Sequence, residues 1–195
     1  MENVFVMVTS KTCGHCVTFK QQHLNKLLTN LSGNGINIIN ISLPDRDIKG
    51  LETKKNDIIV HVGPPDAEIE KKNSSKIVIY YLQGGNIGIN LKIIKLIKGY
   101  PQFFLFPKDS WITQNGPLTG LMFNGTINPD GTSSLNQTGQ PANAETLTKW
   151  IKDNNPPAQN VPLPGYLRPS NPAYNSGSNL TPGNKFKIKI TSFDY

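Results

Sequence analysis

Residues 4–16 have the sequence VFVMVTSKTCGHC, an apolar run that is followed, after a short polar link, by the only two cysteines of the chain. Residues 4–8 are β-branched, aromatic or long apolar side chains, which is typical of a buried strand. Beyond the motif, apolar residues recur at helical spacing, with no Gly or Pro before Gly33. This series consists of Val17, Leu24, Leu27, Leu28 and Leu31. The sequence Cys13-Gly14-His15-Cys16 is therefore expected at a junction between a strand and a helix.

Two cysteines at this spacing can close a small disulfide ring and reopen it. Unpaired backbone N–H groups at the start of a helix favour a thiolate, so we expect Cys13 to be the reactive thiol. Cys16, one helical turn further on, is expected to stay protonated and buried until it acts as the resolving thiol. His15 can add positive charge or a hydrogen-bond donor near the Cys13 sulfur, which would make the disulfide more oxidising.

A zinc site and a structural disulfide are the alternative interpretations of the two cysteines. The chain has no second Cys-x-x-Cys, and His23 and His61 lie too far apart for the paired histidines of a zinc finger. A permanent disulfide between residues three apart would be strained and would close almost no loop, so it would add little stability. We therefore expect no metal and no other cofactor, and redox chemistry is the first hypothesis.

The composition favours one domain with extensions in a chain of 195 residues, of which 36% are hydrophobic. The formal net charge is +7, but the lysines are scattered and the only arginines are Arg46 and Arg168. This pattern favours a solvated basic surface over a nucleic-acid site. The N-terminal residues lack the features of a signal peptide, and no apolar run approaches the ~20 residues that span a bilayer, so we expect a cytoplasmic protein without membrane contact.

The remaining elements follow from periodicity and turn residues. Strands are expected at residues 36–41, 58–62, 77–82, 103–106 and 121–123, a weak helix at 89–97 and a last helix, capped by Asn143, that ends near residue 154. A hairpin-like connection over residues 63–72 is expected to join two of the strands, and Gly84, Gly85 and Gly88 are expected to form a turn. Residues 155–184 are rich in Pro, Asn, Ser and Gly, which predicts an extended tail. The alternation of Lys and apolar residues at 185–190 predicts a final strand that pairs with a sheet edge.

A second motif, Lys98-Gly99-Tyr100-Pro101, precedes the aromatic run at residues 103–106. With Cys-Gly-His-Cys earlier in the chain, it resembles the catalytic domains of protein disulfide isomerases, which have the thioredoxin fold. The resemblance covers residues 3–44 and 86–153. It implies an α/β fold class: a thioredoxin-like domain over residues 1–154, with a central mixed sheet flanked by helices, a β-rich insertion at about residues 45–85, and a C-terminal Pro/Asn-rich tail over residues 155–195.

The resemblance also implies a substrate-binding site. Pro101 would have a cis peptide bond and pack beside the dithiol, and the backbone of Tyr100 would pair with an extended substrate peptide. Two family residues are missing: the acidic residue six positions before the first cysteine is Met7 here, and the arginine before the last helix is Gln140. No carboxylate replaces the acid locally, so proton transfer from Cys16 is expected to be slow or water-mediated.

We therefore predict an enzyme, a thiol–disulfide oxidoreductase that exchanges or isomerises disulfides through Cys13 and Cys16, with His15 tuning the potential. It would need protein substrates with thiols or disulfides and an electron-exchange partner protein. The alternative is a thioredoxin-fold binding or structural module of a larger assembly, with weak or no redox turnover. The Asn-, Ile- and Lys-rich composition suggests an AT-rich genome, as in large DNA viruses, so a virus particle is one such assembly and a virion-associated location is the second expectation.

Overall fold

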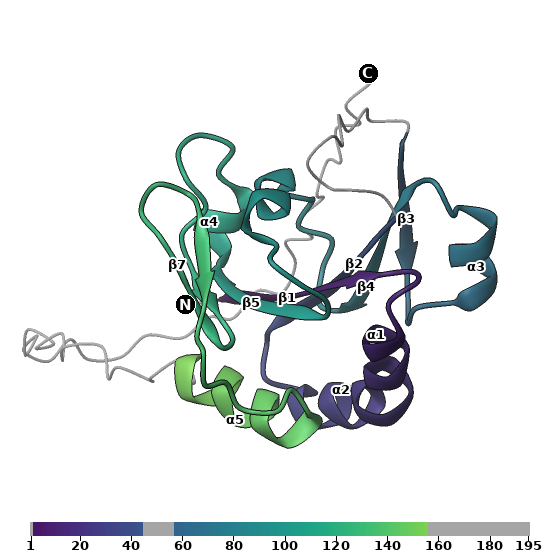
Figure 1. Cartoon of the computed structure of the whole chain (residues 1–195), viewed down its shortest axis with the longest axis horizontal. Helices are drawn as coiled ribbons and strands as arrows, with labels where there is room; N and C mark the ends of the chain where they lie inside the picture. The colour runs from purple at the N-terminus through teal and green to yellow at the C-terminus, as the bar shows by residue number, and fades with distance from the viewer. Residues whose placement is uncertain (1, 45–56, 156–195) are drawn as a thin grey trace, which may run out of the picture. The chain divides into compact units, whose positions relative to one another are not determined.

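The computed structural model describes residues 2–44 and 57–155, which form a mixed α/β fold (Figure 1). The strands are β1 (Asn3–Ser10), β2 (Asn37–Leu43), β3 (Ile58–Val62), β4 (Ile77–Gln83), β5 (Gln102–Pro107), β6 (Leu121–Met122), β7 (Gly125–Ile127) and β8 (Ser133–Leu135). The α-helices are α1 (Gly14–Phe19), α2 (Asn25–Leu31), α3 (Ala67–Lys72), α4 (Lys108–Ile112) and α5 (Ala144–Asn154). None of the helices in these residues combines the length and the apolar character that crossing a membrane requires.

The eight strands form one mixed sheet with the order β3-β4-β2-β1-β5-β6-β7-β8. The central strand β1 is parallel to β2 and antiparallel to β5, so that Val6 lies opposite both Ile39 and Phe104. The edge strand β3 is parallel to β4, and the other neighbours are antiparallel. Cys13 therefore follows β1, which lies in the middle of the sheet between β2 and β5.

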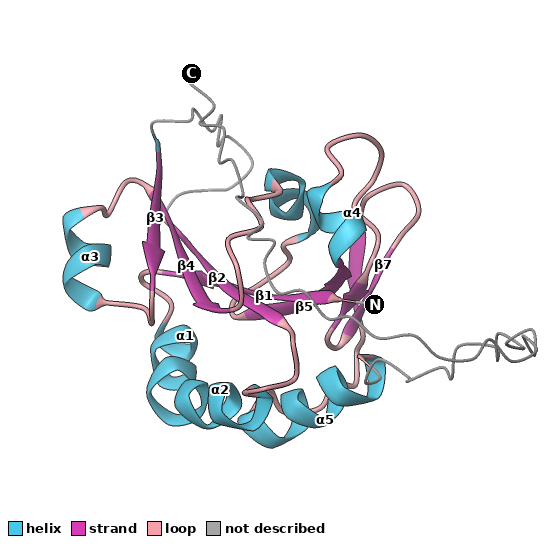
Figure 2. Cartoon of the chain, turned by 180° about the vertical axis from the view of Figure 1, so that it is seen from behind, coloured by secondary structure: helices cyan, strands magenta, loops and turns pink. Residues whose placement is uncertain are grey.

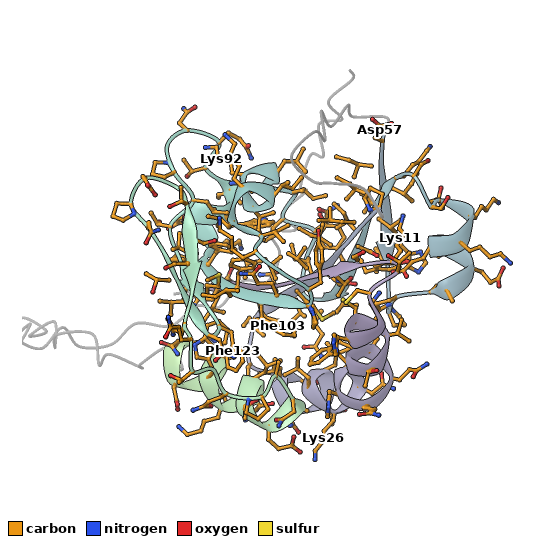
Figure 3. The ribbon with its side chains drawn as sticks, in the orientation of Figure 1. Lys11, Lys26, Asp57, Lys92, Phe103 and Phe123 are labelled. Atoms are coloured by element: carbon orange, nitrogen blue, oxygen red, sulfur yellow. The ribbon has the colours of Figure 1, made fainter. Side chains whose placement is uncertain are left out.

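Each face of the sheet carries an apolar layer. In β1, Val4, Val6 and Val8 belong to one layer and Phe5 and Met7 to the other, as the period-two geometry of a strand requires. These side chains are at most 1% exposed, which confirms the predicted buried strand. Figure 2 shows α1, α2 and α5 along one face and α4 on the other. The aromatic rings labelled in Figure 3, of residues 103 and 123, belong to the layer between the sheet and α5.

The helix after the motif is continuous but not regular. A π-helical segment, η1 (Lys20–Leu24), joins α1 to α2, whereas the sequence predicted a plain α-helix. The buried residues explain it, because Phe19 and Leu24 are five positions apart and a π turn holds one residue more than an α turn. Val17, the first member of the predicted apolar series, is 45% exposed, whereas Leu24, Leu27 and Leu31 are buried.

The predicted hairpin between the strands 58–62 and 77–82 is also wrong. The two strands are parallel, and α3 connects them. The turn residue Asp66 is a helix cap, whose carboxylate accepts hydrogen bonds from the N–H groups of Glu68 at 2.7 Å and Ile69 at 3.2 Å. The charged run after it is thus part of a helix, in which Glu68, Lys71 and Lys72 are exposed and Glu70 is not. Residues 45–56 of the predicted insertion lie outside the described residues.

The last helix is confirmed, since α5 begins after its cap Asn143 and ends at Asn154. The predicted helix at residues 89–97 is a 3-10 helix, η4 (Leu91–Leu96), and α4, β7 and β8 were not predicted. The chain bends at Gly84, and Gly84 and Gly88 have positive φ angles of 86° and 75°, which glycine adopts at no steric cost. The predicted tail from residue 156 and its final strand lie outside the described residues.

Candidate redox site

The central strand leads the dithiol to the start of a helix, as predicted. Cys13 is the N-cap residue of α1, with an extended backbone, and its Sγ accepts a hydrogen bond from the N–H of Cys16 at 3.3 Å. The N–H of Cys13 donates to the carbonyl oxygen of Ser10 at 3.3 Å, which fixes the turn out of β1. The Cys13 sulfur therefore lies at the positive end of the helix, where a thiolate is stabilised.

The two thiols differ in accessibility. Cys13 is partly exposed, whereas Cys16 is fully buried, and both are free cysteines in this structure. Burial, with a smaller effect of the hydrogen bond to Cys13, raises the pKa of Cys16 to about 12, and the Ser10 backbone and the charge of Lys20 oppose this rise. The Cys13 sulfur is accessible to another molecule, while the buried Cys16 stays a neutral thiol, as expected for an attacking and a resolving thiol.

The structure brings Tyr100 and Pro101 to the dithiol. The thiol of Cys13 donates to the carbonyl oxygen of Tyr100 at 3.7 Å, across 87 positions of sequence. The Tyr100–Pro101 peptide bond is cis, as the resemblance implied. Burial, followed by the neighbouring Cys16 and Cys13, raises the pKa of Tyr100 to about 12. Four of the five predicted site residues therefore belong to one cluster.

The fifth predicted site residue, His15, is exposed in the first turn of α1. Its effect on the redox potential stays a prediction. Met7, at the position of the missing acid, is fully buried in the apolar layer under the helices. Gln140 is exposed. Its backbone N–H donates to Oδ1 of Asn124 at 3.0 Å, and its carbonyl oxygen accepts from Nδ2 of Asn124 at 2.7 Å.

The chain matches no protein-family model, no curated protein and no solved structure.

Buried polar groups lie on the sheet face below α1. Thr9 and Asn40 are fully buried on neighbouring strands, and the Asn40 amide donates to the Thr9 hydroxyl at 3.0 Å and to the Met7 carbonyl at 3.1 Å. Ser42, also fully buried, donates its hydroxyl to Oε1 of Glu70 at 2.7 Å. No sequence pattern indicated these groups, because they lie in or beside strands that are predicted only as apolar runs.

A lysine–glutamate pair joins α3 to the helix that carries the motif. Nζ of Lys20 lies 2.9 Å from Oε1 of Glu70, and each side chain is only 15% exposed. Lys20 stands one helical turn after Cys16, a spacing that could have been noticed in the sequence. Glu70 comes from the segment between β2 and β5, where no sequence signal pointed to the dithiol.

Lys11 forms a second link between the motif and that segment. It lies beside α3 (Figure 3), and its ammonium group donates to the carbonyl oxygens of Asn73 and Lys76. Burial is the main reason that the pKa of Lys11 is lowered, whereas the nearby Glu70 raises it. The loop before Cys13 is thus tied to the end of α3 and to the start of β4.

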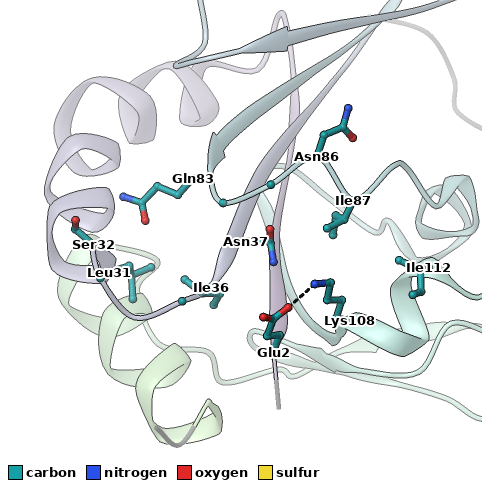
Figure 4. A pocket seen from close by; sticks show the side chains of 14 residues that line it. Glu2, Leu31, Ser32, Ile36, Asn37, Gln83, Asn86, Ile87, Lys108 and Ile112 are labelled. Atoms are coloured by element: carbon teal, nitrogen blue, oxygen red, sulfur yellow. Dashed lines mark hydrogen bonds and ion pairs between the residues drawn. The ribbon is translucent and has the colours of Figure 1, made fainter. Parts of the chain in front are cut away.

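The dithiol does not lie in the pocket shown in Figure 4. This pocket has a volume of about 790 Å³ and is lined by Glu2, Leu31, Asn37 and Lys108 among others, at the end of the sheet where β1 begins. Cys13 follows the end where β1 finishes. Within residues 2–44 and 57–155, no three His, Cys, Asp or Glu side chains are grouped as metal ligands would be. The candidate site is therefore a surface thiol with a buried partner.

Proposed function

We propose that the protein is a thiol–disulfide oxidoreductase with a thioredoxin-like fold. One observation carries the proposal: Cys13 caps a helix beside the Tyr100 carbonyl, and a buried second thiol lies one helical turn further on. A reactive thiol that is open on one side, with a protected thiol in reach, is the arrangement that disulfide exchange needs.

The fold gives further support to the resemblance with disulfide isomerase domains. A central mixed sheet is flanked by helices, the motif lies between β1 and α1, and a cis proline precedes β5 beside the motif. These are the features that the two sequence motifs implied, and they come from segments far apart in the chain. The β3-α3-β4 unit is additional to that resemblance.

The reaction proceeds in two exchange steps. The Cys13 thiolate attacks one sulfur of a substrate disulfide, so that the Cys13–substrate bond forms and the other substrate sulfur leaves as a thiolate. The Cys16 thiolate then attacks the Cys13 sulfur, forms the Cys13–Cys16 disulfide and releases the second substrate thiolate. The substrate disulfide is reduced by two electrons and the dithiol is oxidised, and the reverse sequence oxidises a substrate dithiol.

Insulin reduction with a small dithiol as the electron donor tests the proposal. The wild type is expected to accelerate precipitation of the insulin B chain, Cys13→Ser to lose the effect, and Cys16→Ser to become trapped as a mixed disulfide. Activity of Cys13→Ser equal to wild type would contradict the assignment. The potential of the couple then gives the direction, since about −270 mV is typical of a reductant and about −180 mV of an isomerase.

A binding module is the second candidate, and one observation favours it. Among the described residues, β3 pairs only with β4, and its Val60 and Val62 are 51% and 79% exposed. An apolar edge strand of this kind can accept a strand from another chain. Val60→Lys with Val62→Lys would abolish such an association and leave disulfide exchange unchanged, which separates the two functions.

A further inference from the structure

The buried position of Cys16 presents a chemical difficulty for the proposed reaction. The resolving thiol must become a thiolate to attack the mixed disulfide, but its fully buried sulfur has lost the water that would stabilise a negative charge. The resemblance leads us to expect an acidic residue nearby, but that position is occupied by the apolar Met7. Two other groups favour the charged form of Cys16, the backbone of Ser10 and the side chain of Lys20, and Lys20 is the one that brings a positive charge.

Lys20 is placed to supply that support. It lies one turn after Cys16 on the same continuous helix, and its backbone N–H donates to the Cys16 carbonyl. Its positive charge acts on Cys16 in the direction that favours the thiolate. Cys13 and Tyr100 also interact with Cys16, and neither of them brings a positive charge. His15, the neighbour of Cys16 in the motif, is exposed in the first turn of α1.

Two groups hold Lys20 in this place. Oε1 of Glu70 accepts from the Lys20 ammonium at 2.9 Å and from the buried Ser42 hydroxyl at 2.7 Å, so the carboxylate is itself fixed to β2. At 15% exposure, both partners are shielded from water, whereas in the pair Lys26–Glu145 the side chains are 59% and 58% exposed. Lys26 is thus a suitable control, because it lies on the same continuous helix and has a glutamate partner but is not shielded from water.

We propose that Lys20, positioned by Glu70 and Ser42, stabilises the Cys16 thiolate while it attacks the mixed disulfide. The proposal rests on the proposed oxidoreductase function. Glu70 is a positioning residue, because it acts through Lys20, and it comes from α3. Helix α3 is then a working part of the redox site, and Lys11 also ties the end of this helix to the loop before Cys13.

A stopped-flow reaction of the reduced protein with dithiobis(nitrobenzoate), an aromatic disulfide, separates the two steps. Cys13 first forms a mixed disulfide and releases one nitrothiobenzoate, at a rate proportional to the reagent concentration. Cys16 then closes the Cys13–Cys16 disulfide and releases the second nitrothiobenzoate, at a rate independent of that concentration. The two protein thiols lose two electrons and two protons, and the reagent is reduced to two thiolates.

Lys20→Met is expected to slow the second phase and leave the first unchanged. Each unit by which the Cys16 pKa rises lowers the thiolate fraction tenfold and raises the nucleophilicity of the thiolate about threefold, so closure slows by about threefold per unit at neutral pH. The pH profile of the second phase should move to higher pH. Lys20→Arg keeps the charge and should restore the rate, and Lys26→Met should match the wild type.

An unchanged second phase in Lys20→Met would overturn the proposal, as would equal slowing by Lys26→Met or by Lys20→Arg. If Lys20→Met does not fold, Lys20→Met with Glu70→Gln leaves no unpaired carboxylate, keeps an acceptor for Ser42, and is expected to show the same slowing. Release of a single nitrothiobenzoate by the wild type would instead refute the oxidoreductase function itself, so the two failures are distinguishable.

Discussion

The stability of the reduced protein is expected to fall with rising pH because Cys16 is buried as a neutral thiol. Burial raises its pKa from 9.0 to about 12, so Cys16 ionises in the unfolded chain at a pH at which the folded protein keeps the proton. Between these two values the unfolded state binds fewer protons than the folded state, and the free energy of unfolding decreases as the pH rises. The contribution is present in full well below pH 9 and is lost toward pH 12.

The size of the effect follows from the same two values. At pH 10 about nine-tenths of the unfolded chains carry an ionised Cys16, while the folded thiol is almost entirely neutral. The linkage relation then gives a loss of about 1.4 kcal/mol between about pH 8 and about pH 10. Tyr80 and Tyr100, whose pKa values are raised from 10.0 to about 12, mainly through burial, act in the same direction but mostly above this interval.

Urea unfolding of the reduced wild type and of Cys16→Ala, each at pH 8 and pH 10 with a non-thiol reductant, measures the loss. Lys11, whose lowered pKa opposes the trend, is present in both proteins, so its effect cancels in the comparison. We expect the wild type to lose about 1.4 kcal/mol more than the variant. Equal losses in the two proteins would refute the argument that Cys16 is buried in its neutral form.

Three further substitutions test the elements around the site. Asp66→Ala removes the cap of α3 and should cost about 1 kcal/mol, measured as a lower urea midpoint with an unchanged slope. Asn40→Ala removes buried hydrogen bonds to Met7 and Thr9 and should cost about 1–3 kcal/mol, and an unchanged midpoint would contradict this. Gly14→Ala adds a Cβ at the first helical residue that meets no other part of the structure within 4 Å, so the free energy of unfolding should stay the same or rise by up to about 1 kcal/mol. A destabilised Gly14→Ala would show that the motif tolerates no side chain there.

The sequence predicted the elements whose patterns are local. The run at residues 4–8 lies within β1, Asn143 caps α5, and Gly84 and Gly88 after β4 have positive φ angles. The sequence did not predict features that depend on which segments pack against each other. Whether the strands at 58–62 and 77–82 run parallel or antiparallel depends on the segment between them, and six residues after Asp66 were enough for a helix.

The candidate site divides in the same way. Cys13 and Cys16 were predicted from their spacing, and Tyr100 and Pro101 from the resemblance to disulfide isomerase domains. Glu70 could not be predicted, because its proximity to the dithiol results from α3 lying beside the helix that carries the motif.

The π turn between α1 and α2 separates two requirements that a single helix would have to satisfy together. Each residue of an α-helix turns the chain by about 100°, so without the extra residue the apolar side of α2 would be rotated by roughly that angle relative to α1. The turn lets α1 orient Cys13 and Cys16 toward Tyr100, while Leu27 and Leu31 stay on the sheet. The direction in which α1 presents the dithiol is therefore set separately from the packing of α2 on the sheet, because the π-helical segment between them contains one extra residue.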